Sequence, residues 1–421
     1  MKKIFYAIIS CFIMSSCSGM LDIDSHSGVA PDNITEKDLS ALRMGMYNEV
    51  QNSPERETYI LFDLLGGNLK SKTGSSLDLI NNILSPLNSI VSSGWNGCYN
   101  ALYHVNNVIS IVEAQPESEL KNTILGEAHY FRAYLYRLLV TRWGGVPLIK
   151  KNTLEKLPRE SEKNIWMFIE EELNSAISLL NTSDNYFYLS KDAATALMAR
   201  VKLETGKYDE AYKLAESLIT GDKYALDNFD EIFRGKDNNE VIFSFSCRME
   251  ESNITLSTMF YTYAHPNKGS YIYEPDDEVM LMYDDNDKRK DISITYVGSD
   301  ACINKYPSGQ TGTDPVVISR LAEMYLISAE AQGISNGLGR LNELRKERGL
   351  DPVSPKNEEE FLNCILDERR KEFLAEGYRY YDLVRTNKAQ SVLNIKDYQT
   401  VLPIPGKELI LNTNLEPNPG Y

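Results

Sequence analysis

Apolar side chains recur at spacings of three and four residues along most of the chain, and this spacing predicts α-helices. Residues 121–142 and 164–180 show it most clearly. In the first segment, the apolar positions on one face are Ile124, Leu125, Ala128, Phe131, Leu135, Leu138 and Leu139. Gly144, Gly145 and Pro147 follow and end the predicted helix. The pattern favours a mainly α fold.

Two shorter helices are predicted on either side of Gly206, over residues 192–204 and 208–219. Small side chains occupy the positions where two antiparallel helices would touch, namely Ala196, Ala199, Ala211 and Ala215. This arrangement is similar to a tetratricopeptide unit, a helix pair with a period of about 34 residues.

A second helix pair is predicted over residues 320–332 and 341–348, with a turn through Gly337 and Gly339. The dipeptide Asp314-Pro315 is favourable at a helix start and precedes the first helix of this pair. The pairs are irregularly spaced, so the sequence predicts a helical-repeat scaffold with large insertions.

The insertions are predicted at about residues 51–97 and 222–316, where the helical spacing is lost. Residues 240–247 alternate as a β-strand does, and tyrosines then recur among Gly, Asn, Asp and Pro. Long aromatic-rich loops are typical of functional segments. Flat rings stack on sugars, so the candidate ligand-binding residues are Trp95, Asn96, Tyr261, Tyr263, Tyr271, Tyr273, Tyr283 and Tyr296. For Trp95, the helical spacing to Tyr99 favours packing over stacking.

The N-terminus has the pattern of a bacterial lipoprotein leader. Two lysines precede an apolar run of about 11 residues, too short for the roughly 20 that span a bilayer. Two serines then precede Cys17. We expect residues 1–16 to be removed as a signal peptide and Cys17 to carry a lipid anchor. The alternative is an ordinary cleaved signal with an incidental cysteine. Residues 17–421 are predicted to form a single domain.

The charge balance limits the choice of partners. The chain has 44 Lys plus Arg against 60 Asp plus Glu, a formal net charge of −16. This excess of negative charge argues against a nucleic-acid partner and is compatible with a neutral ligand. The His and Cys residues show no metal-ligand spacing, so no metal or other cofactor is predicted. The pairing of Cys98, Cys247, Cys302 and Cys364 stays open.

Near the C-terminus, charged residues lie three or four positions apart and can pair along helix faces. They are Glu368, Arg369, Glu372, Glu376, Arg379, Asp382 and Arg385. A glycosidase needs carboxylates on opposite sides of the scissile bond, whereas these glutamates share one face. Adjacent arginines also favour ionised carboxylates, whereas a general acid needs a raised pKa. We therefore predict a structural ion-pair network and no enzyme activity.

Several short motifs occur together in a recognisable order. They are Leu21-Asp22, the set Trp95, Tyr99 and Asn106, Arg132-Ala133, Trp143 to Pro147, Asp314 to Ala331, Leu341 to Arg345, Ile365 to Phe373, Glu376 to Arg385, Leu402-Pro403-Ile404-Pro405, Glu408-Leu409 and Asn418-Pro419-Gly420-Tyr421. This ordered set resembles the SusD/RagB family of Bacteroidetes outer-membrane lipoproteins over nearly the whole mature chain. The chain departs from the family at Pro417, where Gln is usual, and it is short, with the loss expected in the variable loops.

The resemblance implies about four tetratricopeptide-like helix pairs packed against a loop-rich, partly β ligand-binding region. It also implies an outward-facing protein, lipid-anchored to the outer membrane, that captures an oligosaccharide without cleaving it. Its partner would be a SusC-like TonB-dependent barrel that imports the nutrient. One alternative is a barrel-closing scaffold that binds peptide or no small ligand. Another is a surface glycoside hydrolase that uses Glu368 or Glu372.

Overall fold

The computed structural model describes residues 34–71, 74–234, 236–249, 252 and 254–421, so the predicted leader and Cys17 lie outside the described residues. The chain divides into two compact units, residues 1–44 and 45–421. Helix α2 (Glu36–Asn52) begins in the first unit and ends in the second. Helices account for 56% of the structure and strands for 6%, which confirms the predicted mainly α fold.

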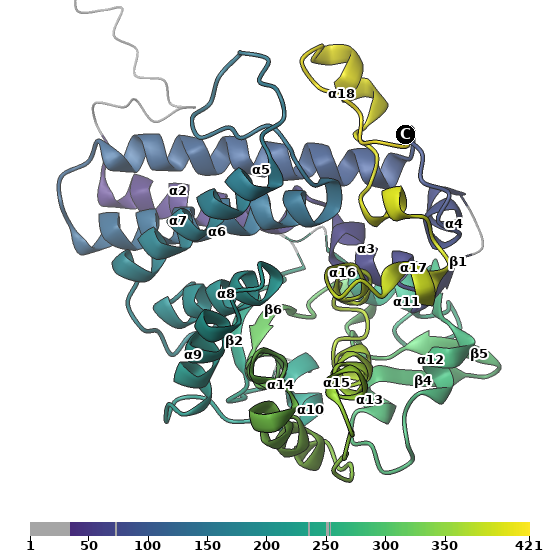
Figure 1. The fold of residues 1–421 in the computed structure, drawn as a ribbon. Coiled ribbons are helices and arrows are strands. Elements are labelled where there is room, and N and C mark those ends of the chain that lie inside the picture. The colour runs from purple at the N-terminus through teal and green to yellow at the C-terminus, as the bar shows by residue number, and fades with distance from the viewer. Residues whose placement is uncertain (1–33, 72–73, 235, 250–251, 253) are drawn as a thin grey trace, which may run out of the picture. The chain divides into compact units, whose positions relative to one another are not determined.

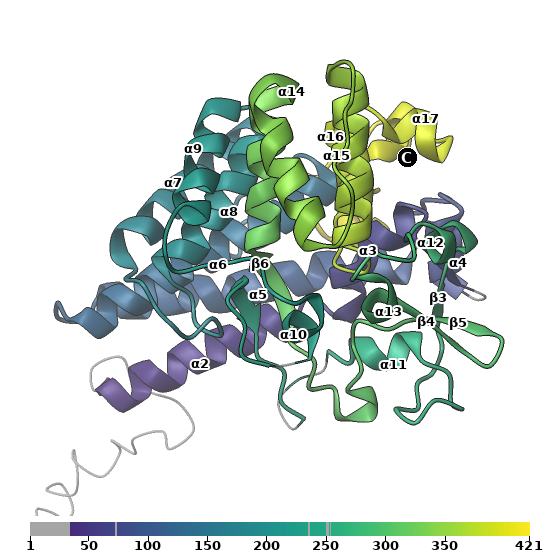
Figure 2. The same ribbon diagram turned by 90° about the horizontal axis from the view of Figure 1, so that it is seen from below.

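The larger unit contains long helices that follow one another in space in the order of the sequence (Figures 1 and 2). They are α5 (Ser89–Glu113), α6 (Glu119–Trp143), α7 (Glu162–Leu179), α8 (Lys191–Glu204), α9 (Tyr208–Ile219), α14 (Leu321–Glu347) and α15 (Glu358–Glu372). Ser118, Ser161 and Ser190 cap α6, α7 and α8 by accepting a hydrogen bond from a first-turn backbone N–H. These helices form the helical scaffold that the apolar spacing predicts.

Helix α14 corrects the predicted second helix pair. Gly337 and Gly339 lie inside this helix, and the break falls at Gly333, whose φ of 66° glycine adopts readily. A Cβ atom on Gly337 would lie 2.0 Å from the carbonyl oxygen of Ala329. Glycine at position 337 therefore allows the two halves of α14 to approach closely.

The segment that follows Asp314-Pro315 is a strand and not the start of a helix. Strand β6 (Val316–Arg320) pairs antiparallel with β2 (Val241–Phe245), and α14 begins only at Leu321. β-Branched residues such as Val316, Val317 and Ile318 favour strands, and here this preference outweighs the helix-start signal of Asp-Pro. The strand predicted over residues 240–247 is confirmed as β2.

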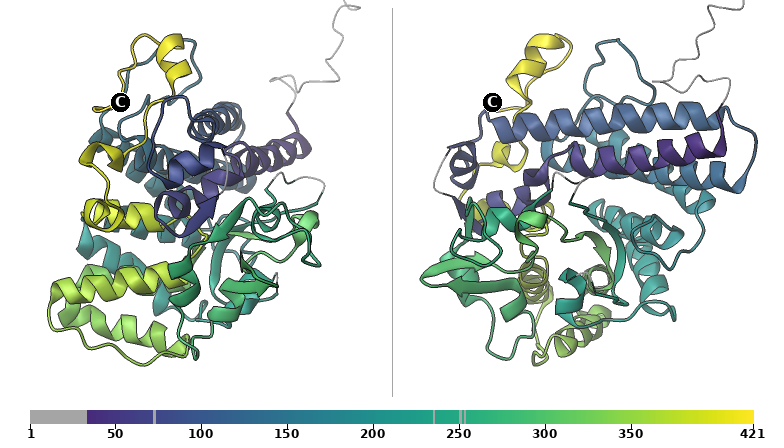
Figure 3. Two further views of the ribbon diagram at one scale, coloured as in Figure 1. Left: turned by 90° about the vertical axis from the view of Figure 1, so that its right-hand side faces the viewer. Right: turned by 180° about the vertical axis from the view of Figure 1, so that it is seen from behind.

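Short elements gather in the segment 254–311, called here the loop-rich region. They are α11 (Leu256–Phe260), β3 (Tyr273–Pro275), α12 (Asp277–Leu281), α13 (Lys290–Ser293), β4 (Ile294–Val297), β5 (Asp300–Ile303) and the 3₁₀ turn η2 (Gly309–Thr311). Strand β3 pairs with β1 (Leu69–Ser71), and β4 pairs with β5. Figure 3 shows from two further sides that these elements lie together, apart from α6–α9.

Shorter helices complete the larger unit. They are α3 (Arg56–Leu65), α4 (Gly74–Ile80), α10 (Phe229–Phe233), α16 (Arg379–Arg385), α17 (Ala389–Leu393), the 3₁₀ turn η3 (Asp397–Thr400) and α18 (Gly406–Leu411). Much of the first predicted insertion is thus helical, because α3 and α4 form within it and α5 begins at Ser89. Helix α16 packs against both α3 and α15. This contact joins the C-terminal motif to the early part of the chain.

Candidate ligand-binding surface

The loop-rich region presents tyrosine rings to solvent. Tyr263 is 74% exposed and Tyr296 is 62% exposed, and Tyr271 is half-buried. Isolated exposed aromatics are common, but these three belong to segments that hydrogen bonds connect. We call Tyr263, Tyr271 and Tyr296 the tyrosine surface.

Backbone hydrogen bonds hold the loop that carries Tyr263. The N–H of Tyr271 donates to the carbonyl of Tyr261 at 3.1 Å, and the N–H of Gly269 donates to Thr262 at 3.2 Å. Within this closed loop, the Lys268 ammonium lies 5.4 Å from the Tyr263 ring centroid. The loop therefore offers an aromatic face beside a hydrogen-bond donor.

Tyr271 connects this loop to the β4–β5 hairpin. Its hydroxyl lies 2.8 Å from the Ala301 carbonyl oxygen and 2.9 Å from the Glu274 carboxylate. Burial raises the pKa of Tyr271 and Glu274 raises it further, so the phenol stays a hydrogen-bond donor. Ala301 is the cross-strand partner of Tyr296. Tyr271 thus joins its loop to the hairpin that carries Tyr296, and exposed aromatic rings with polar neighbours suit recognition of a sugar.

The structure corrects the ligand-binding prediction for three other tyrosines. Tyr261, Tyr273 and Tyr283 are at most 4% exposed, so no face of their rings is open for stacking. The Tyr261 hydroxyl donates to Asn304 at 2.6 Å, and the Tyr283 hydroxyl donates to the Lys371 carbonyl at 2.7 Å. These rings support the loops from inside. Spacing in a loop cannot distinguish an inward ring from an outward one.

Trp95 is also a packing residue, as its helical spacing favoured. It is 3% exposed, and its ring meets Trp143 edge-on at 5.3 Å between ring centroids. The Trp143 indole N–H donates to the Pro403 carbonyl at 3.1 Å. Asn96, the neighbour of Trp95 on α5, is exposed. The ligand-binding candidates that remain open to solvent are therefore Asn96, Tyr263, Tyr271 and Tyr296.

Beneath the loop-rich region lies a group of buried ions, called here the buried charge cluster. Ion pairs link its members, which are Asp287, Arg289, Lys305, Glu240, Arg320, Arg345, Arg348, Glu368, Glu372 and Glu376. Five are basic and five acidic, so their charges balance. Asp287, Arg289 and Lys305 come from the loop-rich region, whereas Arg345, Glu368 and Glu372 come from α14 and α15. The other members lie in β6 or in segments that adjoin β2, α14 and α15. The cluster therefore attaches the loops to the helices.

Glu372 lies at the centre of this cluster. Its carboxylate pairs with Arg289 and Arg348, each at 2.8 Å, and with Arg320. Burial alone would raise the pKa of Glu372, but Arg348, Arg320 and Arg289 hold it well below its usual value. Burial lowers the pKa of Lys305 to about 8, against the opposing effect of Glu376. The carboxylate of Glu372 is therefore ionised and enclosed.

The predicted ion-pair network exists, with partners that the sequence spacing did not identify. Arg369 pairs with Asp382 at 2.8 Å, and Arg385 pairs with Asp382 at 2.9 Å. Glu368, Glu372 and Glu376 pair with the distant basic residues of the buried charge cluster. Arg379 has no acidic partner within the described part of the chain. Because Glu368 and Glu372 are at most 1% exposed, neither can reach a substrate as the hydrolase alternative requires.

Two hollows lie on the surface of the helical scaffold. One, of about 680 Å³, is lined by Trp166, Met167 and Lys207 among others. A second, of about 530 Å³, includes Tyr208 and Phe361. Both volumes fall in the range of small-molecule sites. No group of His, Cys, Asp or Glu that could hold a metal ion occurs among the described residues.

Comparison with known proteins identifies the family. A family profile described as starch-binding associating with outer membrane matches residues 21–203, and the SusD family profile matches residues 301–400. The chain belongs to the SusD/RagB family. The SusD-like protein P38 of Formosa agariphila is 26% identical to it, over 99% of this chain and 98% of the relative. A SusD-like protein of Bacteroides ovatus is also 26% identical, over 72% of this chain and 66% of the relative.

Solved SusD structures share the fold. A SusD superfamily protein from Bacteroides vulgatus aligns with a TM-score of 0.83 at 21% identity, covering 92% of this chain and 99% of that one. Surface glycan-binding protein A from Bacteroides thetaiotaomicron, solved with laminarihexaose, aligns with a TM-score of 0.80 at 20% identity, covering 91% and 100%. In the described segments of our chain, no helix is both long and apolar enough to traverse a bilayer.

Proposed function

We propose that this SusD-family chain captures an oligosaccharide at the cell surface and passes it to a SusC-like TonB-dependent barrel, without breaking a bond. The observation that carries the proposal is the tyrosine surface, in which Tyr263 and Tyr296 expose their rings and Tyr271 joins their segments. A relative of the same fold was solved with laminarihexaose, which supports a glycan as the ligand.

The proposed function includes a lipid on Cys17, which would anchor residues 17–421 to the outside of the outer membrane. Several acyl chains bind a bilayer stably, because each buried CH₂ contributes about 0.8 kcal/mol. The family profile described as associating with the outer membrane supports this location. Metabolic labelling with a radioactive fatty acid tests it, because a Cys17→Ala chain should take up no label.

Isothermal titration calorimetry of residues 18–421 against a panel of plant, host and microbial glycans, laminarihexaose included, tests the binding. We expect one glycan class to give a saturating signal. Tyr296→Ala or Tyr263→Ala should weaken that binding about tenfold, because a stacked ring contributes about 1.5 kcal/mol. Tyr208→Ala is the matched control, since Tyr208 is 51% exposed but lies on the helical scaffold.

Three results would contradict the proposal. Silence across a broad panel, with a barrel protein that copurifies, would favour the alternative of a barrel-closing scaffold. Equal loss of binding in Tyr208→Ala and Tyr296→Ala would place the ligand away from the tyrosine surface. Release of shortened glycan during the titration would revive the hydrolase alternative with residues other than Glu368 and Glu372.

A further inference from the structure

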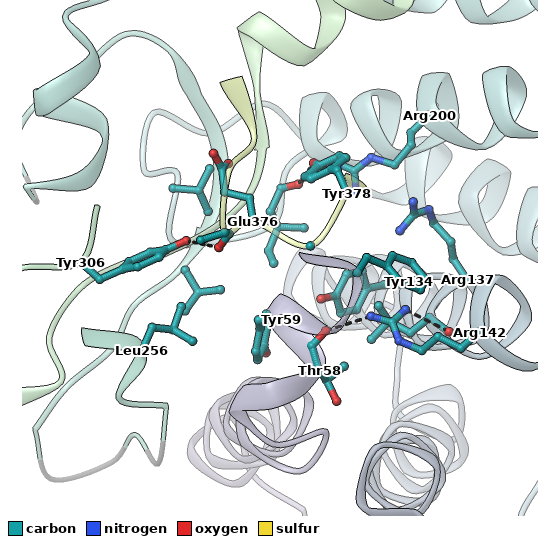
Figure 4. Close-up of a pocket in the computed structure, with 17 residues that line it drawn as sticks. Thr58, Tyr59, Tyr134, Arg137, Arg142, Arg200, Leu256, Tyr306, Glu376 and Tyr378 are labelled. Carbon is teal, nitrogen blue, oxygen red and sulfur yellow. Dashed lines mark hydrogen bonds between the residues drawn. The ribbon is translucent and has the colours of Figure 1, made fainter. Parts of the chain in front are cut away.

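A polar cavity of about 50 Å³ lies between α3, α6, β6 and residues 375–378 (Figure 4). Its lining includes Tyr59, Tyr134, Arg137, Arg142, Arg200 and Glu376. The cavity is far smaller than the several hundred Å³ of a usual ligand site, so it cannot hold a sugar. It is large enough for a water molecule or a monatomic ion.

Most charges around the cavity are already paired. Arg137 donates to Glu204 at 2.8 Å, and Arg200 donates to Glu323 at 2.6 Å. Glu376 is the acidic side chain that lines the cavity, and it accepts from Lys305 at 2.6 Å and from Arg320. These three lining groups therefore contribute almost no net charge to the cavity.

Arg142 is the exception. Its side chain is 3% exposed and has no acidic partner among the described residues. Its guanidinium donates to the carbonyls of Thr58 at 2.9 Å and Leu138 at 3.1 Å, and it lies 4.5 Å from the Phe62 ring centroid. Its Nε atom is buried without a hydrogen-bond partner. A buried charge without a counter-charge is costly, so the site carries one uncompensated positive charge.

Tyr134 provides a second donor at the same place. Its side chain is 4% exposed, and no described residue accepts a hydrogen bond from its hydroxyl. Figure 4 shows the Tyr134 ring between Arg142 and Tyr378, with its oxygen directed toward the middle of the group. Tyr134 also acts electrostatically on the pKa of Arg142, as expected for close neighbours. A phenol and a guanidinium are both hydrogen-bond donors that stabilise an anion.

We propose that the cavity binds a small monovalent inorganic anion, chloride under physiological conditions, between the Arg142 guanidinium and the Tyr134 hydroxyl. One negative charge neutralises the excess positive charge of Arg142. A polyvalent anion such as sulfate carries more negative charge than Arg142 can neutralise, and it is larger than a halide in a cavity of about 50 Å³. The anion ties α6 to α3, because Arg142 and Thr58 belong to these helices.

Thermal unfolding of the full chain, purified in a mild nonionic detergent, tests the proposal. Midpoints are measured at equal ionic strength in sodium chloride, sodium bromide, sodium sulfate and sodium gluconate. We expect chloride or bromide at 100 times its Kd to raise the midpoint by about 2–3 °C over gluconate, and sulfate to give no such rise. A bromide-soaked crystal should show an anomalous peak beside Arg142.

Three variants locate the effect. Tyr134→Phe removes one donor and should diminish the halide shift, and Arg142→Met should abolish it. Tyr59→Phe is the matched control, since its ring lines the cavity but its hydroxyl donates away from it to the Gln51 carbonyl at 2.7 Å. This control should lose stability but keep the full halide shift. If Arg142→Met does not fold, Tyr134→Phe alone decides the question.

Several outcomes overturn the proposal. Equal halide shifts in Tyr134→Phe, Tyr59→Phe and the parent chain would place the anion elsewhere. Identical midpoints in all four salts would mean that the cavity holds only water. A bromide peak that needs molar bromide, without any midpoint shift at physiological concentrations, would reduce the finding to binding at crystal concentration only.

Discussion

Replacement of Glu372 by glutamine should destabilise the protein far more than the loss of an ordinary ion pair. Glu372 is fully buried and pairs with Arg289, Arg320 and Arg348. Glutamine has nearly the same shape but no charge, so it leaves three arginines with one negative charge fewer. Breaking a buried pair by removal of one partner costs about 3–5 kcal/mol, because a charge stays buried without compensation.

The matched control is Glu343→Gln. Glu343 pairs with Arg340 three residues away on α14, but it is 53% exposed. Exposed pairs contribute about 0–1 kcal/mol, since water screens them. Urea unfolding of both variants, followed by tryptophan fluorescence and circular dichroism, should therefore separate them by about 2–5 kcal/mol. Free energies of unfolding within about 1 kcal/mol of each other would refute the role given to the buried charge cluster.

The pH dependence gives an independent check of the same reasoning. The three arginines hold the pKa of Glu372 well below its usual 4.5 in the folded state. The stability that its ionised form contributes is present above the unfolded pKa and is lost as the pH falls through the folded pKa. The difference in free energy of unfolding between the parent chain and Glu372→Gln should therefore be largest at neutral pH and shrink below about pH 4.5. A difference that grows in acid would contradict the argument.

Three further predictions concern other parts of the chain. Gly97→Ala should lower the free energy of unfolding by about 1–3 kcal/mol in urea, because a Cβ atom at this position would lie 1.9 Å from a backbone carbonyl oxygen. Gly339→Ala, where no atom lies within 4 Å of the added Cβ, should instead stabilise α14 by about 0.5–1 kcal/mol. Burial raises the pKa of Asp63 to about 6, so its contribution to stability should fall from pH 4 to pH 6, and the parent chain should lose stability relative to Asp63→Asn over that range. Burial raises the pKa of the Cys98 thiol to about 12, and Cys98 is fully buried, so a thiol reagent should label the half-buried Cys364 first, as peptide mapping by mass spectrometry can show.

The helical scaffold could be predicted because its information is local. Apolar spacing of three and four residues determined α6 and α7, and the positive φ of Gly206 at the α8–α9 turn follows from its position between two helical patterns. The prediction failed at α14, where two candidate turn glycines lie inside the helix. Composition alone cannot tell a glycine that turns the chain from one that lets two helices touch.

The candidate site could be predicted only in part, because the direction of a loop side chain depends on partners far away in the sequence. Tyr261 and Tyr263 are two residues apart in the same polar loop, yet one is fully buried and the other 74% exposed. The buried tyrosine has a partner more than forty residues away, at Asn304. No spacing rule within the loop carries that information.

Helical spacing did not predict the partners in the buried charge cluster, but the neighbours of its basic residues in the sequence give a second signal. Arg320 directly precedes the apolar residues Leu321 and Ala322, Arg142 precedes Trp143, and Lys305 precedes Tyr306. A lone charge in such a setting must find a buried partner, since burial of an isolated charge is costly. Arg320 and Lys305 find carboxylates in the motif around Glu372, and Arg142 finds none among the described residues. The same rule that explains the conspicuous charges of the C-terminal motif therefore also points to the anion beside Arg142.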